Sequence, residues 1–362
     1  TEDEFLKGIE YLINNNIILI DTTTDEKAYI PTDTSTTKRV PDWVKNNAGW
    51  WAEDLIGDYD FLNGIKYLIN KGIILVSAND DQTEPYLIYE GAMISNYWGF
   101  LKDLDLLSPV LLPHSNDMQI PNGVIVTSVF DVYGIRGDFT IVGDQVVWGT
   151  PVFGLNPNNM ENYNEIAIWD DPQKAAVVFP IFTASAYSSP GFYNYYSGEC
   201  DWCTTTTISG GVLDYNSSVY GYQLLTLLGY PSITDIDIDK NPSILKKYDK
   251  IIMLHNEYVT RTMFDAITSH PNVIYLYPNA LYAEIEVDYD NDTITLIRGH
   301  NYPEEEITNG FDWEFDNTRP YEFDNNCQEM KFYKIDNGWM TNCFPEKVLP
   351  GKPGIFKVIK DL

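Results

Sequence analysis

The sequence predicts an α/β protein, in which a parallel sheet carries β-rich additions and follows small α-helical repeats at the N-terminal end. Three observations predict this fold class. Short apolar segments alternate with helical ones between residues 175 and 277, which is typical of parallel βαβ units. Closely spaced strand-like segments precede them, between residues 124 and 148. Apolar residues at helical spacing occur twice within the first 76 residues.

A repeated segment opens the chain. Residues 5–20 align without gaps to residues 61–76, at an offset of 56 residues. The apolar residues of the second copy have helical spacing, and Gly72 provides a left-handed helix stop. A further helix is expected over 42–55, before the second copy. We therefore expect a partial helical repeat over 1–20, a linker over 21–40, a helical repeat over 41–76 and a second linker over 77–85.

The second copy carries the motif Trp-Val-Lys-Asn-Asn-Ala-Gly-Trp-Trp over residues 43–51. This motif resembles a short helical repeat found in many secreted and surface proteins of ammonia-oxidising archaea. The resemblance implies an extracellular or cell-surface protein of archaeal origin, with repeats that contact other envelope proteins. It implies no chemistry.

The remaining elements are expected in three sections, and their bounds follow from hydrophobic periodicity and from turn residues. The β-rich section, 86–174, has strands expected over 124–133, 139–142 and 145–148. The α/β section, 175–300, has strands expected over 175–182, 210–215, 232–237, 251–254 and 273–277, and helices over 217–228, 241–247 and 260–269. A hairpin over 284–288 and 293–297 turns at residues 290–292, and the section 301–362 is expected to be rich in strands and loops.

The charge of the chain restricts its partners. The sequence has 53 acidic and 23 basic residues, which give a net charge of −30. This argues against nucleic acid or an anionic membrane as a partner, because both need a basic face. An acidic surface favours solubility in salt and attracts small cations. No segment approaches the ~20 apolar residues that a membrane-spanning helix needs.

The four cysteines form two local pairs, Cys200 with Cys203 and Cys327 with Cys343. We expect two structural disulfides in an oxidising compartment. The closer pair is also compatible with a redox-active motif or with half of a zinc site. Asn216 and Asn291 begin glycosylation sequons, and Asn291 is the better acceptor because it lies in the expected hairpin turn.

Polar side chains follow the expected strands at the points where these strands end. In an open parallel sheet such positions share one edge, where functional groups gather. The candidates are Tyr187, Tyr215, His255, Glu257 and Asn279. Each also has a purely structural interpretation: His255 as a bonded strand end, Glu257 as a cap of the helix at 260, Asn279 as a turn former, and the two tyrosines as packing residues.

The stretch from Tyr248 to Ile267, with Asn279-Ala-Leu-Tyr282, is similar to the C-terminal domain of the large subunit of the N,N-dimethylformamidase family. The resemblance implies a flavodoxin-type, glutamine-amidotransferase-like fold. It further implies a mononuclear iron held by two tyrosines and Glu257, with His255 and Asn279 as the adjacent catalytic residues. Tyr187 and Tyr215 are the best positional matches for the tyrosines. Val259 and Ala283 stand where the family has tryptophan.

These observations favour an extracellular amidohydrolase that hydrolyses a small amide. The alternative is a non-catalytic cell-surface or envelope protein that retains the fold. Two other hydrolase classes do not fit the sequence. No cysteine lies at a strand–helix elbow, as a class I amidotransferase requires, and no Gly-x-Ser-x-Gly motif is present.

Overall fold

The fold is taken from a computed structural model, which describes residues 86–89, 92–95, 110–111, 117–121, 123–135, 138–172, 174–209 and 217–362. The chain divides into two compact units, Thr1–Ile94 and Ser95–Leu362. The first unit contributes β1 (Tyr86–Tyr89) and most of β2 (Ala92–Ser95). The expected repeats and linkers, residues 1–85, lie outside the described residues.

The second unit begins with antiparallel β-structure. In it β6 (Phe130–Gly134) pairs on one side with β9 (Pro151–Leu155) and on the other with β3 (Val110–Leu111). Two hairpins accompany them: β4 (Asp117–Ile120) with β5 (Gly123–Val126), and β7 (Phe139–Val142) with β8 (Gln145–Trp148). The segment 124–133 of the expected β-rich section consists of two strands, because β5 ends at Val126 and β6 begins at Phe130.

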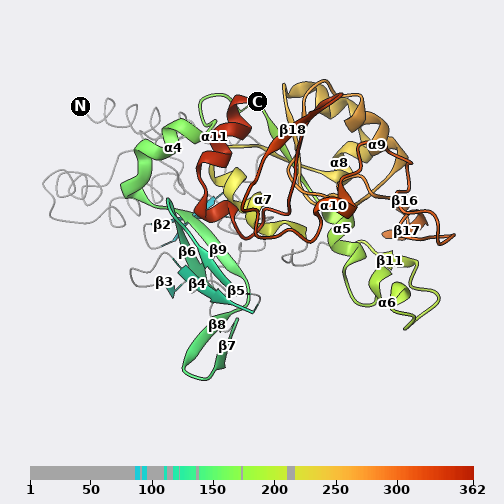
Figure 1. The fold of residues 1–362 in the computed structure, drawn as a ribbon, viewed down its shortest axis with the longest axis horizontal. Helices are drawn as coiled ribbons and strands as arrows, with labels where there is room; N and C mark the ends of the chain where they lie inside the picture. Colours follow the sequence, from blue (N-terminus) through green and yellow to red (C-terminus); the bar gives the residue numbers. More distant parts are fainter. Residues whose placement is uncertain are drawn as a thin grey trace, which may run out of the picture. The chain divides into compact units, whose positions relative to one another are not determined.

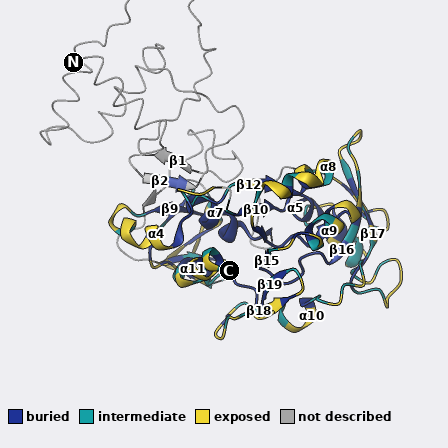
Figure 2. Cartoon of the chain, turned by 90° about the horizontal axis from the view of Figure 1, so that it is seen from above, coloured by how far each residue is buried: buried dark blue, intermediate teal, exposed yellow. Residues whose placement is uncertain are grey.

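A mixed, mostly parallel sheet forms the centre of this unit, as the sequence predicts. Its order is β12-β10-β13-β15-β19-β18, and every neighbouring pair is parallel except the last. The strands are β10 (Ala176–Phe179), β12 (Ser232–Thr234), β13 (Ile251–Met253), β15 (Val273–Tyr275), β18 (Phe332–Ile335) and β19 (Gly338–Thr341). The residues of β10, β13 and β15 are all buried, as expected of strands covered on both faces. Figure 2 shows β10 and β15 in the dark blue of buried residues.

Helices accompany this sheet, and several of them connect its strands (Figure 1). They are α5 (Ile181–Ala186), α6 (Phe192–Tyr196), α7 (Val219–Leu227), α8 (Asp235–Lys240), η4 (Pro242–Lys247), α9 (Arg261–Thr268), α10 (Thr318–Tyr321), η5 (Leu349–Gly351) and α11 (Gly354–Asp361). All residues of α7 are buried, because this helix packs against β10 on one side and β9 on the other. It therefore joins the antiparallel section to the parallel sheet.

Several expected elements differ from those observed. The strands expected over 175–182 and 232–237 end at Phe179 and Thr234, and each is followed at once by a short helix. The helices α4 (Met160–Ile166) and α11 were not expected from the sequence; they pack together and lie side by side in Figures 1 and 2. The strand expected over 210–215 lies outside the described residues.

A second, smaller sheet lies beyond the ends of the parallel strands. Its order is β11 (Thr205–Thr207), β17 (Thr293–Arg298), β16 (Ala283–Asp288) and β14 (Tyr258–Val259). The expected hairpin is confirmed as the antiparallel pair β16–β17. Because β14 follows β13 closely along the chain, the short connection between them, residues 254–257, is held between the two sheets.

Candidate functional site

The connection from β13 to β14 carries His255, Asn256 and Glu257, and hydrogen bonds fix its path. The side chain of Asn256 accepts a bond from the N–H of Leu254 (2.9 Å). The N–H groups of Leu281, Tyr282 and Ala283 donate to the carbonyls of Asn256 and Glu257. A polar segment is thereby held in the interior, and its side chains are directed by a rigid backbone.

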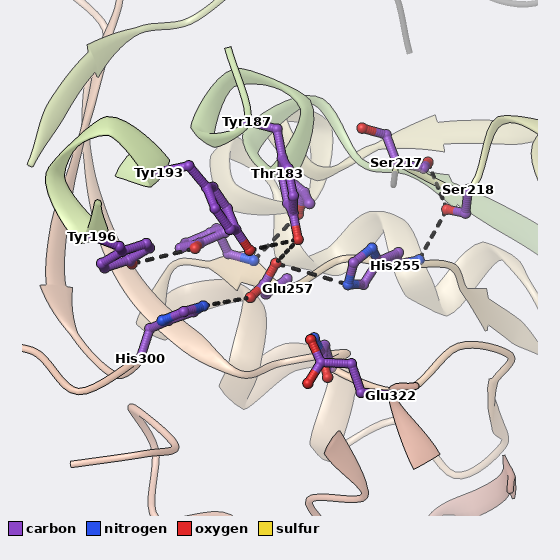
Figure 3. Close-up of polar contacts among 12 residues, drawn as sticks. Thr183, Tyr187, Tyr193, Tyr196, Ser217, Ser218, His255, Glu257, His300 and Glu322 are labelled. Atoms are coloured by element: carbon purple, nitrogen blue, oxygen red, sulfur yellow. Dashed lines mark hydrogen bonds and ion pairs between the residues drawn. The ribbon is translucent and has the colours of Figure 1, made fainter. Parts of the chain in front are cut away.

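Glu257 is at the centre of the candidate site and is fully buried. The hydroxyl of Tyr187 donates a hydrogen bond of 2.9 Å to its Oε2. The Nε2 atoms of two histidines lie 3.8 Å from the carboxyl group, that of His255 from Oε2 and that of His300 from Oε1. Figure 3 shows the two rings on opposite sides of Glu257. Oε1 has no hydrogen-bond partner among the described residues.

The environment of Glu257 favours its neutral form. Burial raises the pKa of this carboxyl to about 8; the hydrogen bond from Tyr187 opposes the rise, and the nearby Glu322 adds to it. Helix capping does not explain Glu257, because Thr260 caps α9 by accepting a bond from the N–H of Met263 (3.1 Å). A buried carboxyl with a strongly raised pKa at the edge of a parallel sheet is a candidate functional group.

A chain of phenols leads from Glu257 to the surface. The hydroxyl of Tyr193 donates to that of Tyr187 (2.7 Å), and the two rings stack at a centroid distance of 4.3 Å. Tyr187 is a residue expected from the sequence, whereas Tyr193 is not. The pKa of Tyr187 is raised by burial and by the charge of Glu257, so Tyr187 is a neutral phenol in this arrangement. Tyr193 and its neighbour Tyr196 belong to α6, and the tyrosine-rich segment 193–196 was the available sequence signal.

His300 is a further site residue that the sequence reasoning missed. Its ring stacks on Tyr196 at 4.1 Å with an interplanar angle of 8°. The backbone at His300 and Asn301 is left-handed, with φ of 57° and 62°, and both N–H groups bond to carbonyls of the segment 307–308. Consecutive non-glycine residues in this region are uncommon and are held by their surroundings. The sequence signal for His300 is that histidine is rare in this chain, which has 4 histidines, so each one is a candidate site residue.

The other candidates have different positions. Asn279 is buried and left-handed (φ 64°), as a turn former would be, but its Nδ2 also donates to Glu322 Oε1 (3.1 Å). Its Oδ1 has no partner among the described residues. The backbone N–H of His255 donates to Ser218 Oγ (3.0 Å), and the ring packs edge-on against Phe344. Tyr215 and Asn216 lie outside the described residues.

The cysteines and the second sequon make no contact with Glu257 in the described structure. The Cα atoms of Cys200 and Cys203 are 5.7 Å apart and those of Cys327 and Cys343 are 5.5 Å apart, so both expected pairs form disulfides. Asn291 is exposed in the turn between β16 and β17, where its side chain donates to Asp288 (2.7 Å). Among the described residues, no helix is long and apolar enough to cross a membrane.

The resemblance implies an iron ion, and the chemistry of the oxygen atoms at Glu257 and Tyr187 suits that ion. One carboxyl oxygen lacks a hydrogen-bond partner among the described residues, and a phenol oxygen lies at hydrogen-bond distance from the other. Such hard oxygen donors suit iron. Within the described parts of the chain, no group of three or more His, Cys, Asp or Glu residues is arranged to hold a metal ion, so tyrosines would have to take part.

No protein-family model matches this chain, and no curated protein matches it.

Proposed function

We propose that this chain is an extracellular amidohydrolase-like protein, with a flavodoxin or glutamine-amidotransferase-like fold, that hydrolyses a small amide at a mononuclear iron site. One observation carries the proposal. Glu257 is fully buried at the carboxyl edge of the parallel sheet, is bonded to Tyr187, and has an oxygen without a hydrogen-bond partner among the described residues. A carboxyl in that state calls for an explanation beyond packing.

Glu257 and Tyr187 would hold the iron, together with Tyr215, which lies outside the described residues. Bound iron supplies a Lewis acid that polarises an amide carbonyl and makes hydroxide available near neutral pH. Tyr187 and Glu257 bond to each other at 2.9 Å, so both side chains would be available as ligands at one place. Tyr193, whose hydroxyl donates to Tyr187 Oη, would orient that phenol.

His255 and Asn279 have separate roles in the proposed reaction. His255 is buried and its Nε2 lies 3.8 Å from Glu257 Oε2, within reach of a group that gains or loses a proton beside the carboxylate. Asn279 holds its amide against Glu322 and leaves Oδ1 without a partner among the described residues, so this oxygen would accept an N–H of the substrate.

Two features support the extracellular part of the proposal. Both cysteine pairs form disulfides, which persist in oxidising compartments. The strongly acidic composition, with a net charge of −30, favours solubility in salt. The partners of the N-terminal repeats would be other envelope proteins.

Metal analysis of protein isolated without chelator tests the proposal. We expect near-stoichiometric iron, a visible tyrosinate charge-transfer band, and release of ammonia or amine from a panel of small amides. Glu257→Gln keeps the shape of the side chain and should lower iron content at least ~10-fold, and Tyr187→Phe should weaken the band, because each removes a charged ligand.

The matched control is Tyr222→Phe, since the hydroxyl of Tyr222 in α7 donates to Ser232 of β12 (3.1 Å) and makes no contact with Glu257 or Tyr187. This variant should keep the iron and the band. A colourless wild-type protein without iron or amidase activity would refute the proposal and leave the alternative, a non-catalytic envelope protein that retains the fold.

A further inference from the structure

We infer that His300 is an additional ligand of this site, and that a transition-metal ion lies between its Nε2 and Oε1 of Glu257. The inference rests on the proposed function, because it adds a ligand to the same metal site. Neither the sequence pattern nor the resemblance assigns a role to His300.

Within the described part of the chain, Glu257 Oε1 lacks the hydrogen-bond partner that a buried oxygen normally has. This atom belongs to a fully buried side chain and has no hydrogen-bond partner among the described residues. Leaving a buried polar atom unsatisfied costs ~1–3 kcal/mol, so native proteins seldom do so without a ligand, water or ion to occupy the place. The unsatisfied oxygen faces the imidazole of His300 (Figure 3).

The distance between His300 and Glu257 fits a shared metal ion. His300 Nε2 lies 3.8 Å from Glu257 Oε1. This is too long for a hydrogen bond. It is shorter than two metal–ligand bonds of ~2.0–2.2 Å laid end to end, so one ion can contact both atoms. The pair is therefore spaced as two ligands of one cation rather than as a hydrogen-bonded pair.

Ring packing and backbone conformation fix the orientation of the His300 side chain. Its ring stacks on Tyr196, and the edges of Tyr193 and Tyr282 pack against it at 5.8 Å each. The left-handed backbone at His300 (φ 57°) directs the side chain inward. The side chain is 28% exposed, whereas that of Glu257 is 0% exposed, so an ion can enter past His300. Fixed orientation with one accessible side is typical of a ligating histidine.

His255 is the weaker candidate for this ligand. It approaches Oε2, which already accepts the hydrogen bond from Tyr187, and it lies on the other side of Glu257 in Figure 3. Its side chain is only 5% exposed.

The ligand types decide the class of ion. An imidazole nitrogen with a carboxylate oxygen suits iron or zinc, whereas Mg²⁺ and Ca²⁺ prefer oxygen ligands throughout. The hydroxyls of Tyr187 and Tyr193 add oxygen donors beside the carboxyl group. Selective binding of a transition-metal ion is therefore expected, with Mg²⁺ as the discriminating ion.

The test measures binding of Zn²⁺ to the metal-free full chain by calorimetry, with Mg²⁺ as the comparison and with Co²⁺ absorption as the readout of the ligand set. His300→Gly is the informative variant, because glycine accepts the positive φ without strain and the fold is therefore expected to survive. We expect at least ~10-fold weaker Zn²⁺ binding, as loss of a ligand should cost no less than loss of an outer-shell partner. Added imidazole, at a concentration that leaves wild-type binding unchanged, should restore the affinity and the Co²⁺ spectrum.

The matched control is Tyr196→Phe, which keeps the ring stacked on His300 and removes only the hydroxyl that contacts Tyr258 (3.3 Å). Its Zn²⁺ affinity should equal that of the wild type. Unchanged affinity and an unchanged Co²⁺ spectrum in folded His300→Gly would overturn the inference and leave the proposed function standing. If Mg²⁺ bound as tightly as Zn²⁺, the inference that the site selects a transition-metal ion would be wrong. A wild-type chain that binds no transition metal, iron included, would refute the proposed function itself.

Discussion

Buried carboxyl groups show how single residues serve structure in one place and chemistry in another. Asp235 accepts backbone hydrogen bonds from Phe182 (2.7 Å) and Ile236 (2.9 Å), so it ties the start of α5 to the start of α8. Glu346 accepts from the N–H groups of Tyr220 and Gly221 in α7. Glu346 also accepts from the hydroxyl of Tyr277, as Glu257 does from that of Tyr187, but one oxygen of Glu257 has no hydrogen-bond partner among the described residues. That contrast separates the candidate site from the structural carboxyls.

Asp235 should make stability depend on pH. Burial raises the pKa of this carboxyl well above its ordinary value, so the folded state keeps a proton that the unfolded chain loses near pH 4. Its contribution is complete below that pH and declines as pH rises through the folded pKa, because the folded state then binds more protons than the unfolded state. In Asp235→Asn, which cannot ionise, the decline should be smaller than in the wild type.

Urea unfolding at a series of pH values measures this difference. Near pH 4 the variant should be less stable by ~1–2 kcal/mol, since an amide replaces one of the two acceptor oxygens. The gap should narrow as pH rises. Parallel stability curves for the two proteins across the series would contradict the raised pKa of Asp235.

At the scale of elements, the sequence predicts the alternation of strands and helices better than their ends. The sequence predicts a single strand from Ser232 to Asp237. Instead Thr234 and Asp237 form a reciprocal capping box, and the chain turns into α8. The amphipathic helix α11, with Phe356 and Ile359 buried, was overlooked because it is short and lies in a loop-rich section.

The candidate site was predictable only where it depends on the parallel sheet. His255 and Glu257 follow β13 and Tyr187 follows α5, so strand order alone brings them to one edge. His300 arrives through the turn after β17, and Tyr193 and Tyr196 through the short helix α6. Their positions depend on turn geometry and on ring stacking between segments distant in sequence, which periodicity does not report.

Helix α7 offers a test of packing at the scale of an element. A Cβ atom at Gly221 would lie well inside van der Waals contact of the Tyr277 hydroxyl. Gly221→Ala should therefore destabilise the protein by ~1–2 kcal/mol, because overpacking costs ~1–3 kcal/mol and the gain in helix propensity returns up to ~1 kcal/mol. Denaturant unfolding measures the change in the free energy of unfolding.

The control for this substitution is Gly354→Ala, since nothing lies within 4 Å of a Cβ at that helical position. It should be neutral or slightly stabilising. In a Tyr277→Phe background, Gly221→Ala should cost less, which a double-mutant cycle detects as a coupling energy. If the two changes are additive, the contact with the hydroxyl is not what keeps position 221 a glycine.

At the scale of the whole molecule, the fold joins two kinds of sheet around a buried helix and stabilises its C-terminal loops covalently. The helix α7 packs between β9 of the antiparallel section and β10 of the parallel sheet. After β17 the chain forms few long elements, and the disulfide Cys327–Cys343 closes a loop there with both cysteines fully buried. The other disulfide, Cys200–Cys203, spans a sequence separation of only 3. The two bridges should therefore differ in their effect on stability.

Loop length sets the size of the expected difference. The pair Cys327–Cys343 has a sequence separation of 16, and the chain-entropy relation gives ~3 kcal/mol for a loop of that length but only about half as much for the pair at 200 and 203. The double variant Cys327→Ser/Cys343→Ser should accordingly lose ~3 kcal/mol of stability in denaturant unfolding, and Cys200→Ser/Cys203→Ser should lose clearly less.

Alkylation of the denatured, unreduced wild-type protein, read by intact mass, should modify no cysteine. Four modified thiols would refute both bridges and with them the main structural support for an oxidising compartment, whereas equal losses in the two variants would show that loop closure does not govern their contributions.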